Sequence, residues 1–218
     1  MVKTVFIKAY KNPESLVVSK EKLSSLLKTL GSVPDKSLHI TYSIQYHSLA
    51  LEVKKFLEDE GFAISKFFQV LGCRRLNIPK LPVLHVGTGE FHATNPNILE
   101  LTDKIILFDG HNITSIPQEV ISDYKKSIDT KIKRYSNSKS VGLLISVKPG
   151  QHDINNALRF SEENHDKKFY HFLTNNVNPS EFENFNTVDF WVNTACPRIE
   201  DDSPNIISLE RLNQTNKK

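Results

Sequence analysis

Two cysteines are the residues of this sequence best suited to hold a metal. The chain has 218 residues and only two cysteines, Cys73 and Cys196. Arg74 and Arg75 follow the first and Arg198 lies just after the second, and positive charge favours the thiolate, the form that binds metals. A single free cysteine is as often a small buried hydrophobic residue. Two cysteines that each follow a predicted strand are better explained by one shared metal site.

Two further loops place polar groups just after predicted strands. Residues 87–92 begin with a Gly-x-Gly turn and include Gly89 and His92. Residues 148–151 form a turn that leads into a predicted helix, where free N–H groups and the amide of Gln151 could hold a carboxylate. Taken alone, both loops are more often structural turns than binding sites. No pair among the eight histidines has metal-ligand spacing, so we do not expect zinc.

The Gly-x-Gly turn leaves a nucleotide-binding protein open as an alternative. In that class an acidic residue that binds the ribose is expected about twenty positions after the glycines, and Asp109 has this spacing. Asp109 also stands directly after the next predicted strand, and a Gly-x-Gly pair alone is weak evidence. The sequence has no Walker motif, kinase signature or Ser-His-Asp order.

The spacing of apolar residues predicts strands that alternate with helices. The strands are expected at residues 4–8, 38–43, 67–71, 83–86, 105–108, 141–147, 168–173 and 188–192. Helices are expected at residues 19–30, 48–60, 117–135 and 153–163, with a short one near Pro179. The strands are almost wholly apolar, which is typical of a parallel sheet covered by helices on both faces. Ligands of such sheets bind at the carboxyl ends of the strands, where the candidate loops lie.

We therefore predict an α/β fold with two Rossmann-like domains, each with a parallel central sheet, related by duplication. Residues 1–115 form the domain that carries Cys73, and residues 116–218 form the domain that carries Cys196. The long charged helix at 117–135 and the polar hinge at 136–140 lie at the junction. Identity between the halves is too low for periodicity alone to establish a repeat.

The composition is that of an ordinary globular protein, with 39% hydrophobic and 24% charged residues and a net charge of +3. No apolar run approaches the length of a membrane helix and no signal-peptide pattern is seen, so we expect a cytoplasmic protein without a membrane partner. Basic residues at 125–134 alternate with acids and apolar positions, as on a solvated helix face. We expect no direct nucleic-acid binding. Contact with an RNA-associated acidic partner is the less favoured alternative.

Five blocks of sequence, in order, resemble the diphthamide synthesis family, in both its archaeal form and its paired eukaryotic subunits. They are residues 69–73, 89–92, 105–109, 147–151 and 192–202. The last block contains Asn-Thr-Ala-Cys-Pro-Arg at 193–198 and is the most specific. The resemblance extends from Val5 to about Leu212 and covers the C-terminal two-thirds of the family's length.

The resemblance implies a noncanonical radical enzyme. In the family, three α/β domains each give one cysteine to a four-iron four-sulfur (4Fe-4S) cluster, which leaves one iron for S-adenosylmethionine. Electron transfer yields a 3-amino-3-carboxypropyl radical, which adds to a histidine of translation elongation factor 2 in the first step of diphthamide biosynthesis. On this reading Cys73 and Cys196 are cluster ligands. The residues implied to hold S-adenosylmethionine are Gly89, His92, Gln151, Arg198 and Asp202.

The chain departs from the family pattern in two places. The family's first domain and its cysteine are absent, and residues 4–8 resemble only the closing strand of that domain. Residues 93–95 replace the proline that usually follows the Phe-His pair. Three explanations stay open: a partner subunit supplies the third cysteine, the chain is a noncatalytic subunit or scaffold, or the gene is truncated. If Cys73 and Cys196 share a cluster, their Cα atoms should lie within about 12 Å, and an electron donor is a further expected partner.

Overall fold

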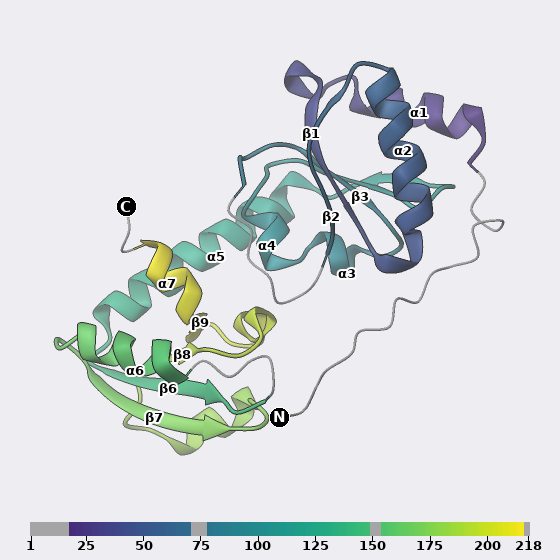
Figure 1. The fold of residues 1–218 in the computed structure, drawn as a ribbon. Coiled ribbons are helices and arrows are strands. Elements are labelled where there is room, and N and C mark those ends of the chain that lie inside the picture. Colours follow the sequence, from purple (N-terminus) through teal and green to yellow (C-terminus); the bar gives the residue numbers. More distant parts are fainter. Residues whose placement is uncertain (1–17, 71–77, 149–153, 216–218) are drawn as a thin grey trace. The chain divides into compact units, whose positions relative to one another are not determined.

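The computed structural model describes residues 18–70, 78–148 and 154–215 and divides into two compact units (Figure 1). The first unit ends at Asp123 and the second begins at Tyr124, each with its own sheet. The α/β class predicted from the sequence is confirmed. The domain boundary predicted after residue 115 stays a prediction, and the strand expected at residues 4–8 lies outside the described residues.

The first unit contains a five-stranded sheet with the order β2-β1-β3-β4-β5. Its strands are β1 (Ser37–Tyr42), β2 (Ala63–Gln69), β3 (Val83–Val86), β4 (Ile105–Phe108) and β5 (Ile113–Ser115). The first four pair in parallel, as predicted, whereas β5 pairs antiparallel to β4. β5 was not predicted, because it is a three-residue, largely exposed edge strand with no apolar pattern of its own.

Two amphipathic helices cover one face of this sheet, α1 (Lys20–Leu30) and α2 (His47–Asp59). Ser19 begins α1 by accepting a hydrogen bond from the N–H of Lys22 at 3.3 Å. Shorter elements follow in chain order: η2 (Pro34–Lys36), η3 (Ile44–Tyr46), α3 (Glu90–Ala93) and α4 (Pro96–Leu99). The core consists of side chains that these helices and the strands bury, including Leu26, Leu30, Leu38, Ile40, Val53, Leu57, Leu84 and Phe108.

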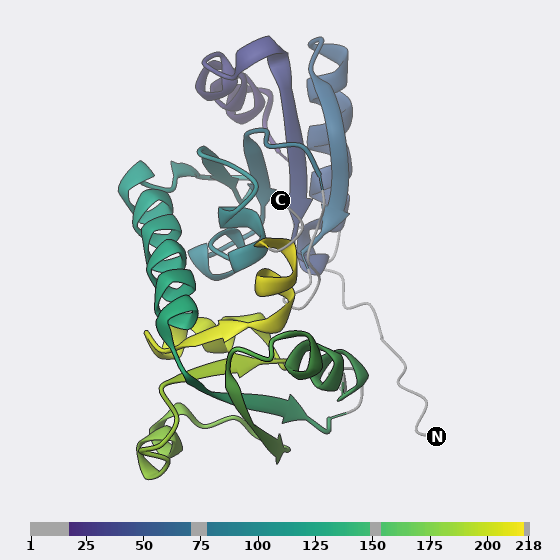
Figure 2. The same cartoon turned by 90° about the vertical axis from the view of Figure 1, so that its left-hand side faces the viewer.

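The second unit contains a four-stranded, fully parallel sheet with the order β7-β6-β8-β9. Its strands are β6 (Ser140–Ser146), β7 (Lys168–Thr174), β8 (Phe190–Asn193) and β9 (Ile206–Ser208). Its helical elements are α6 (Ile154–Glu163), α7 (Leu209–Thr215), the 3₁₀ segments η4 (Pro179–Asn184) and η5 (Pro197–Asp202), and the larger part of α5 (Gln118–Asn137), which begins in the first unit. Figure 2 shows α5 as one long helix, whose end at Asn137 includes part of the predicted polar hinge.

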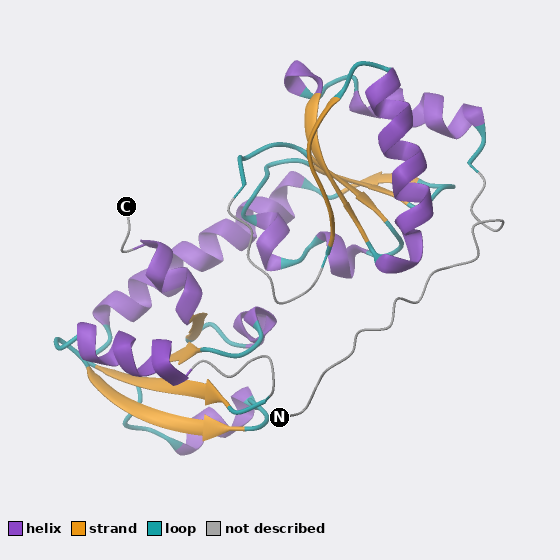
Figure 3. Cartoon of the chain, in the orientation of Figure 1, coloured by secondary structure: helices purple, strands orange, loops and turns teal. Residues whose placement is uncertain are grey.

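The two faces of the second sheet are covered differently (Figure 3). Residues of α5, α6 and α7 pack on the face that carries Leu143 and Val192. The other face carries Leu144, Trp191 and Ile206 and is covered by residues of η4 and η5. Phe182 of η4 stacks on Trp191 with ring centroids 4.3 Å apart. No helix in the described ranges is long and apolar enough to cross a membrane.

Gly142 in β6 lies directly beneath the indole ring of Trp191. A Cβ atom added at Gly142 would lie 2.4 Å from Trp191 Cε3 and Cζ3. We expect Gly142→Ala to lower the free energy of unfolding by about 1–3 kcal/mol, because overpacking forces the ring to move. Urea unfolding followed by far-UV circular dichroism measures this loss. In a Trp191→Leu background the same substitution should cost much less, and an equal cost in both backgrounds would disprove the steric explanation.

Candidate functional site

Cys196 lies in a turn at the carboxyl end of β8, where it precedes η5 as its N-cap. Its thiol is free and its side chain is partly exposed. The backbone carbonyl of Cys196 accepts hydrogen bonds from Asn193 Nδ2 at 3.0 Å and from the N–H of Ile199 at 3.1 Å. These hydrogen bonds connect the turn to β8 through Asn193 and to η5 through Ile199.

The residues before Cys196 fix this turn to the sheet. The Asn193 side chain is buried, and its carbonyl oxygen accepts a hydrogen bond from the N–H of Ala195 at 2.7 Å. Thr194 donates its backbone N–H and its hydroxyl to the carbonyl of Leu144 on β6, at 3.0 and 3.1 Å. The Asn-Thr-Ala segment of the motif thus anchors the strand end from which Cys196 projects.

Two of the residues predicted to bind S-adenosylmethionine belong to the same turn as Cys196. Arg198 is partly buried, with Nε 3.9 Å from Asp201 Oδ2, and Asp202 is exposed at the end of η5. Asp201 is exposed but partly desolvated, which raises the pKa of its carboxyl, and the charge of Arg198 opposes this rise. The turn that follows Cys196 therefore carries a cation and two carboxylates.

Glu200 is fully buried in this turn and was not predicted from the sequence. Glu200 Oε1 accepts the N–H of Ser208 at 2.7 Å, and Oε2 accepts Nε and Nη2 of Arg211 at 3.1 and 2.9 Å. Lys131 Nζ on α5 donates to the backbone carbonyl of Glu200. Glu200 is followed by two further acids at 201 and 202, and three acids in a row are typical of a solvated surface segment. No local signal therefore distinguishes Glu200 from its neighbours.

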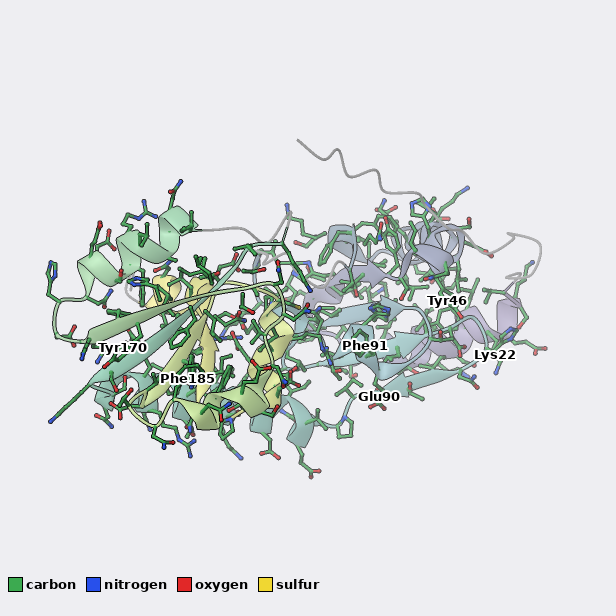
Figure 4. All side chains as sticks on the ribbon, turned by 90° about the horizontal axis from the view of Figure 1, so that it is seen from below. Lys22, Tyr46, Glu90, Phe91, Tyr170 and Phe185 are labelled. Atoms are coloured by element: carbon green, nitrogen blue, oxygen red, sulfur yellow. The ribbon has the colours of Figure 1, made fainter. Side chains whose placement is uncertain are left out.

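In the first unit, β3 leads into the loop that carries Gly89 and His92. Gly89 has a φ of +77°, a left-handed conformation that favours glycine, and it precedes the short helix α3. Figure 4 shows Glu90 and Phe91, which belong to α3, and Phe91 is 62% exposed. His92 is partly buried, with its ring centroid 6.3 Å from that of His85. The structure thus places Gly89 and His92 in one turn.

His85, the third residue of β3, packs against Gly87 at the start of this loop. It is fully buried, with Nδ1 2.9 Å from Thr41 Oγ1 and Nε2 3.4 Å from Ser43 Oγ. Burial, together with the charge of His92, lowers the pKa of His85 to about 4. A Cβ atom at Gly87 would lie 2.7 Å from Ser43 Oγ, so the loop packs tightly over this neutral cluster.

Asp109 has a structural role that accounts for its position after β4. Its Oδ1 accepts hydrogen bonds from the N–H groups of His111 at 2.8 Å and Asn112 at 2.7 Å. Partial burial would raise the pKa of Asp109, but these hydrogen bonds outweigh that effect and lower it. Asp109 therefore closes the turn between β4 and β5, as Asx side chains do. This structural role explains why an aspartate stands at position 109 without a bound ribose.

Two predicted site residues, Cys73 and Gln151, lie outside the described residues. The expected proximity of Cys73 and Cys196 accordingly stays a prediction. Across the described ranges, no three side chains of His, Cys, Asp or Glu gather in a metal-binding arrangement. Cys196, Arg198 and Asp202 are brought together in the second unit, and Gly89 and His92 in the first.

Comparison with known proteins gives consistent results. The family model described as diphthamide synthesis protein matches residues 2–205. The 2-(3-amino-3-carboxypropyl)histidine synthase of Pyrococcus horikoshii is 26% identical over 91% of this chain and 59% of its own length. The corresponding synthase subunit 1 of Neurospora crassa is 24% identical over 82% of this chain and 44% of its own length. The chain thus spans about half the length of these curated relatives.

Solved structures share the fold. Two crystal structures of Dph2 from Pyrococcus horikoshii, the second described as containing a 4Fe-4S cluster, superpose with TM-scores of 0.68 and 0.67. Both are 23% identical to this chain and cover 90% and 89% of it, but only 62% and 60% of the Dph2 chain is matched. The likeness supports the duplicated Rossmann-like arrangement predicted from the sequence.

The low pKa of His85 predicts acid sensitivity. Between pH 6.5 and about 4 the unfolded chain binds a proton at this histidine and the folded chain does not. The neutral His85 side chain therefore contributes its full share to the free energy of unfolding above pH 6.5. This contribution is lost as the pH falls from 6.5 toward 4. We expect His85 to contribute about 2 kcal/mol to the loss of unfolding free energy between about pH 7 and pH 5.

Urea unfolding at these two pH values measures the effect. His85→Asn should flatten the pH dependence, whereas His165→Asn, at an exposed histidine, should leave it as in the unsubstituted chain. Equal pH dependence in all three proteins would contradict the assignment.

Proposed function

Because this chain belongs to the diphthamide synthesis protein family, we propose that it acts in the first step of diphthamide biosynthesis as a 2-(3-amino-3-carboxypropyl)histidine synthase. The reaction transfers the 3-amino-3-carboxypropyl group of S-adenosylmethionine to a histidine of translation elongation factor 2. The observation that carries the proposal is Cys196, a free and partly exposed thiol fixed at the carboxyl edge of a parallel sheet. It occupies the cysteine position of the family's most specific motif.

The residues present fit part of a 4Fe-4S site. Thiolates are the ligands that such clusters require, and Cys196 is neither oxidised in a disulfide nor buried in the core. Arg198 lies in the same turn, two residues after the thiol. Cys73 is the second proposed ligand, on the basis of the resemblance alone. When bound, the cluster supplies the electron that breaks the bond between the sulfonium sulfur and the methionine γ-carbon.

The chain's own residues have the task of binding and orienting S-adenosylmethionine. Arg198 offers a guanidinium group for the carboxylate of the methionine moiety, and Asp202 offers an exposed carboxylate for its amino group. The left-handed turn at Gly89 lets a ligand approach the backbone closely, beside His92. Gln151 completes the proposed set as an amide donor. These residues would determine how the substrate is placed, whereas the cysteines would hold the cluster.

A partner is part of the proposal, because two protein thiolates do not complete a site that uses three. The eukaryotic relatives are named as subunit 1 of the synthase, which supports assembly with a further subunit. We propose that another chain supplies the third cysteine and that an electron donor reduces the assembled site in the cytoplasm. The alternative is a supporting subunit that keeps the fold while a partner performs the reaction.

Metal binding is the first test. After anaerobic reconstitution with iron and sulfide, the chain should retain a labile cluster, seen as iron content, visible absorbance and a paramagnetic resonance signal upon reduction. Cys196→Ala and Cys73→Ala should each lose most of the bound iron, because each removes one of two protein ligands. Ser136→Ala, at an exposed position on α5, serves as the matched control. Retention of a full cluster by both cysteine variants would refute the proposed ligands.

Activity with a partner is the second test. The chain alone, with reductant and labelled S-adenosylmethionine, should transfer little or no label to elongation factor 2, and addition of the partner subunit should restore transfer. Full turnover by the chain alone would refute the requirement for a partner. Undiminished turnover of a complex that carries Cys196→Ala would identify the chain as a scaffold.

A further inference from the structure

Glu200 anchors the turn that follows Cys196 to three other elements of the second unit. Its carboxylate binds the backbone of β9 through Ser208 and the guanidinium of Arg211 on α7. Its backbone carbonyl accepts from Lys131 on α5. Arg211 Nη2 also donates to Tyr124 Oη at 2.8 Å. The chemistry of this cluster is thus a buried, hydrogen-bonded ion pair with a second cation beside it.

Stability alone does not explain these buried charges. Burial of an ion pair costs desolvation free energy, and apolar residues of similar volume often give equal or greater stability. The cost is visible at Lys131, where burial lowers the pKa, although the charges of Glu200 and Asp201 oppose this effect and Arg211 and Arg134 add to it. An ion pair also fixes direction, which an apolar cluster does not, because a guanidinium group donates paired hydrogen bonds to a carboxylate in few orientations.

The anchored turn is short and leads directly to the thiol. Cys196 is the N-cap of η5 and Glu200 lies within η5, so both belong to one 3₁₀ segment. The N–H of Ile199 donates to the carbonyl of Cys196, which couples the two ends. Asn193 holds the opposite side of Cys196 through β8. Only three residues separate Glu200 from Cys196, so we expect a displacement of Glu200 to move Cys196 as well.

A second contact restrains the chain after η5. Arg134 Nη1 on α5 donates to Asn205 Oδ1 at 2.9 Å and to the carbonyl of Pro204 at 3.4 Å. Helix α5 thus contacts the segment at two places, through Lys131 and Arg134. Both contacts, like that of Glu200 with Arg211, lie within the second unit.

We propose that Glu200 is a positioning residue for Cys196, and that its buried ion pair with Arg211 fixes the orientation in which the thiol meets the iron-sulfur cluster. The inference rests on the proposed function, since it concerns the same cysteine. Glu200 touches neither the proposed substrate nor the proposed cluster, because its carboxylate is turned into the protein and fully hydrogen-bonded. Its effect is exerted through η5.

The test uses the reactivity of the Cys196 thiol, which needs no cluster. In a Cys73→Ala background Cys196 is the only thiol. Its side chain is partly exposed, so its rate of modification by a disulfide reagent reports how accessible the thiol is, and this rate rises when the turn is less firmly held. We expect Glu200→Gln, which removes the charge at constant size, to raise this rate by about threefold or more. Glu210→Gln, at an exposed glutamate at the start of α7, should leave the rate unchanged. Equal rates in the two variants would overturn the inference.

The spectrum of the cluster is the second readout, in the chain with both cysteines. Glu200→Gln should broaden the paramagnetic resonance signal of the reduced, reconstituted chain, because several thiol orientations replace one, and Glu210→Gln should not. Unchanged thiol rate and spectrum with only a lower melting temperature would reduce Glu200 to a structural residue. If the unsubstituted chain retains no iron, the proposed function fails, and the thiol assay separates that failure from the failure of this inference.

A second variant keeps the test decisive if Glu200→Gln does not fold. Glu200→Leu with Arg211→Met and Lys131→Met fills the same space with apolar side chains, which should preserve folding. The inference requires faster modification of Cys196 in this folded variant, because direction is lost while packing is kept. Modification at the rate of the parent Cys73→Ala chain would show that packing alone positions the thiol and would overturn the inference.

Discussion

Parallel pairing of β6 with β8 is the constraint on which the arrangement of the candidate site depends. The register places Leu144 opposite Asn193, so Thr194 reaches the carbonyl of Leu144 and Cys196 emerges at the carboxyl edge of the sheet. The first sheet obeys the same rule. There Gly87 donates its N–H to the carbonyl of Phe108 at the end of β4, and the loop with Gly89 emerges at the carboxyl edge. Both loops owe their positions to strand pairing.

Most of the fold could be predicted from the sequence, because burial of the central strands leaves them apolar and burial of one helix face leaves a periodic stripe. The elements that were missed are too short to show either signal clearly. Strand β9 has three residues and owes its burial to pairing with β8, which only the folded chain brings near. Helix α7 follows β9 without a break, so no turn residue marks its start at Leu209. Long-range pairing, rather than local preference, defines these elements.

The residues of the candidate site likewise differ in whether local sequence or long-range contacts define their surroundings. That Cys196, Arg198 and Asp202 lie in one turn could be predicted, because one short motif contains them all. Glu200 could not, because its partner Lys131 lies 69 positions away in the sequence and its neighbours at 201 and 202 are exposed. His85 reads as an ordinary strand residue. Its neutral state is a consequence of burial and of contact with Thr41, 44 positions earlier, and neither feature is local.

The two units support their carboxyl-edge loops with different chemistry. Under the first loop, His85 and two hydroxyl groups form a neutral cluster, which loses its hydrogen-bonding pattern when the imidazole takes up a proton. Under the second, Glu200 is balanced by Arg211 and Lys131, and the charges hold each other in place. A neutral cluster costs less to bury but fixes orientation weakly, whereas an ion pair costs more and fixes it strongly. The ion pair, which is the costlier of the two to bury, packs against the turn that carries Cys196. The role proposed for that thiol, as a cluster ligand, requires a defined direction.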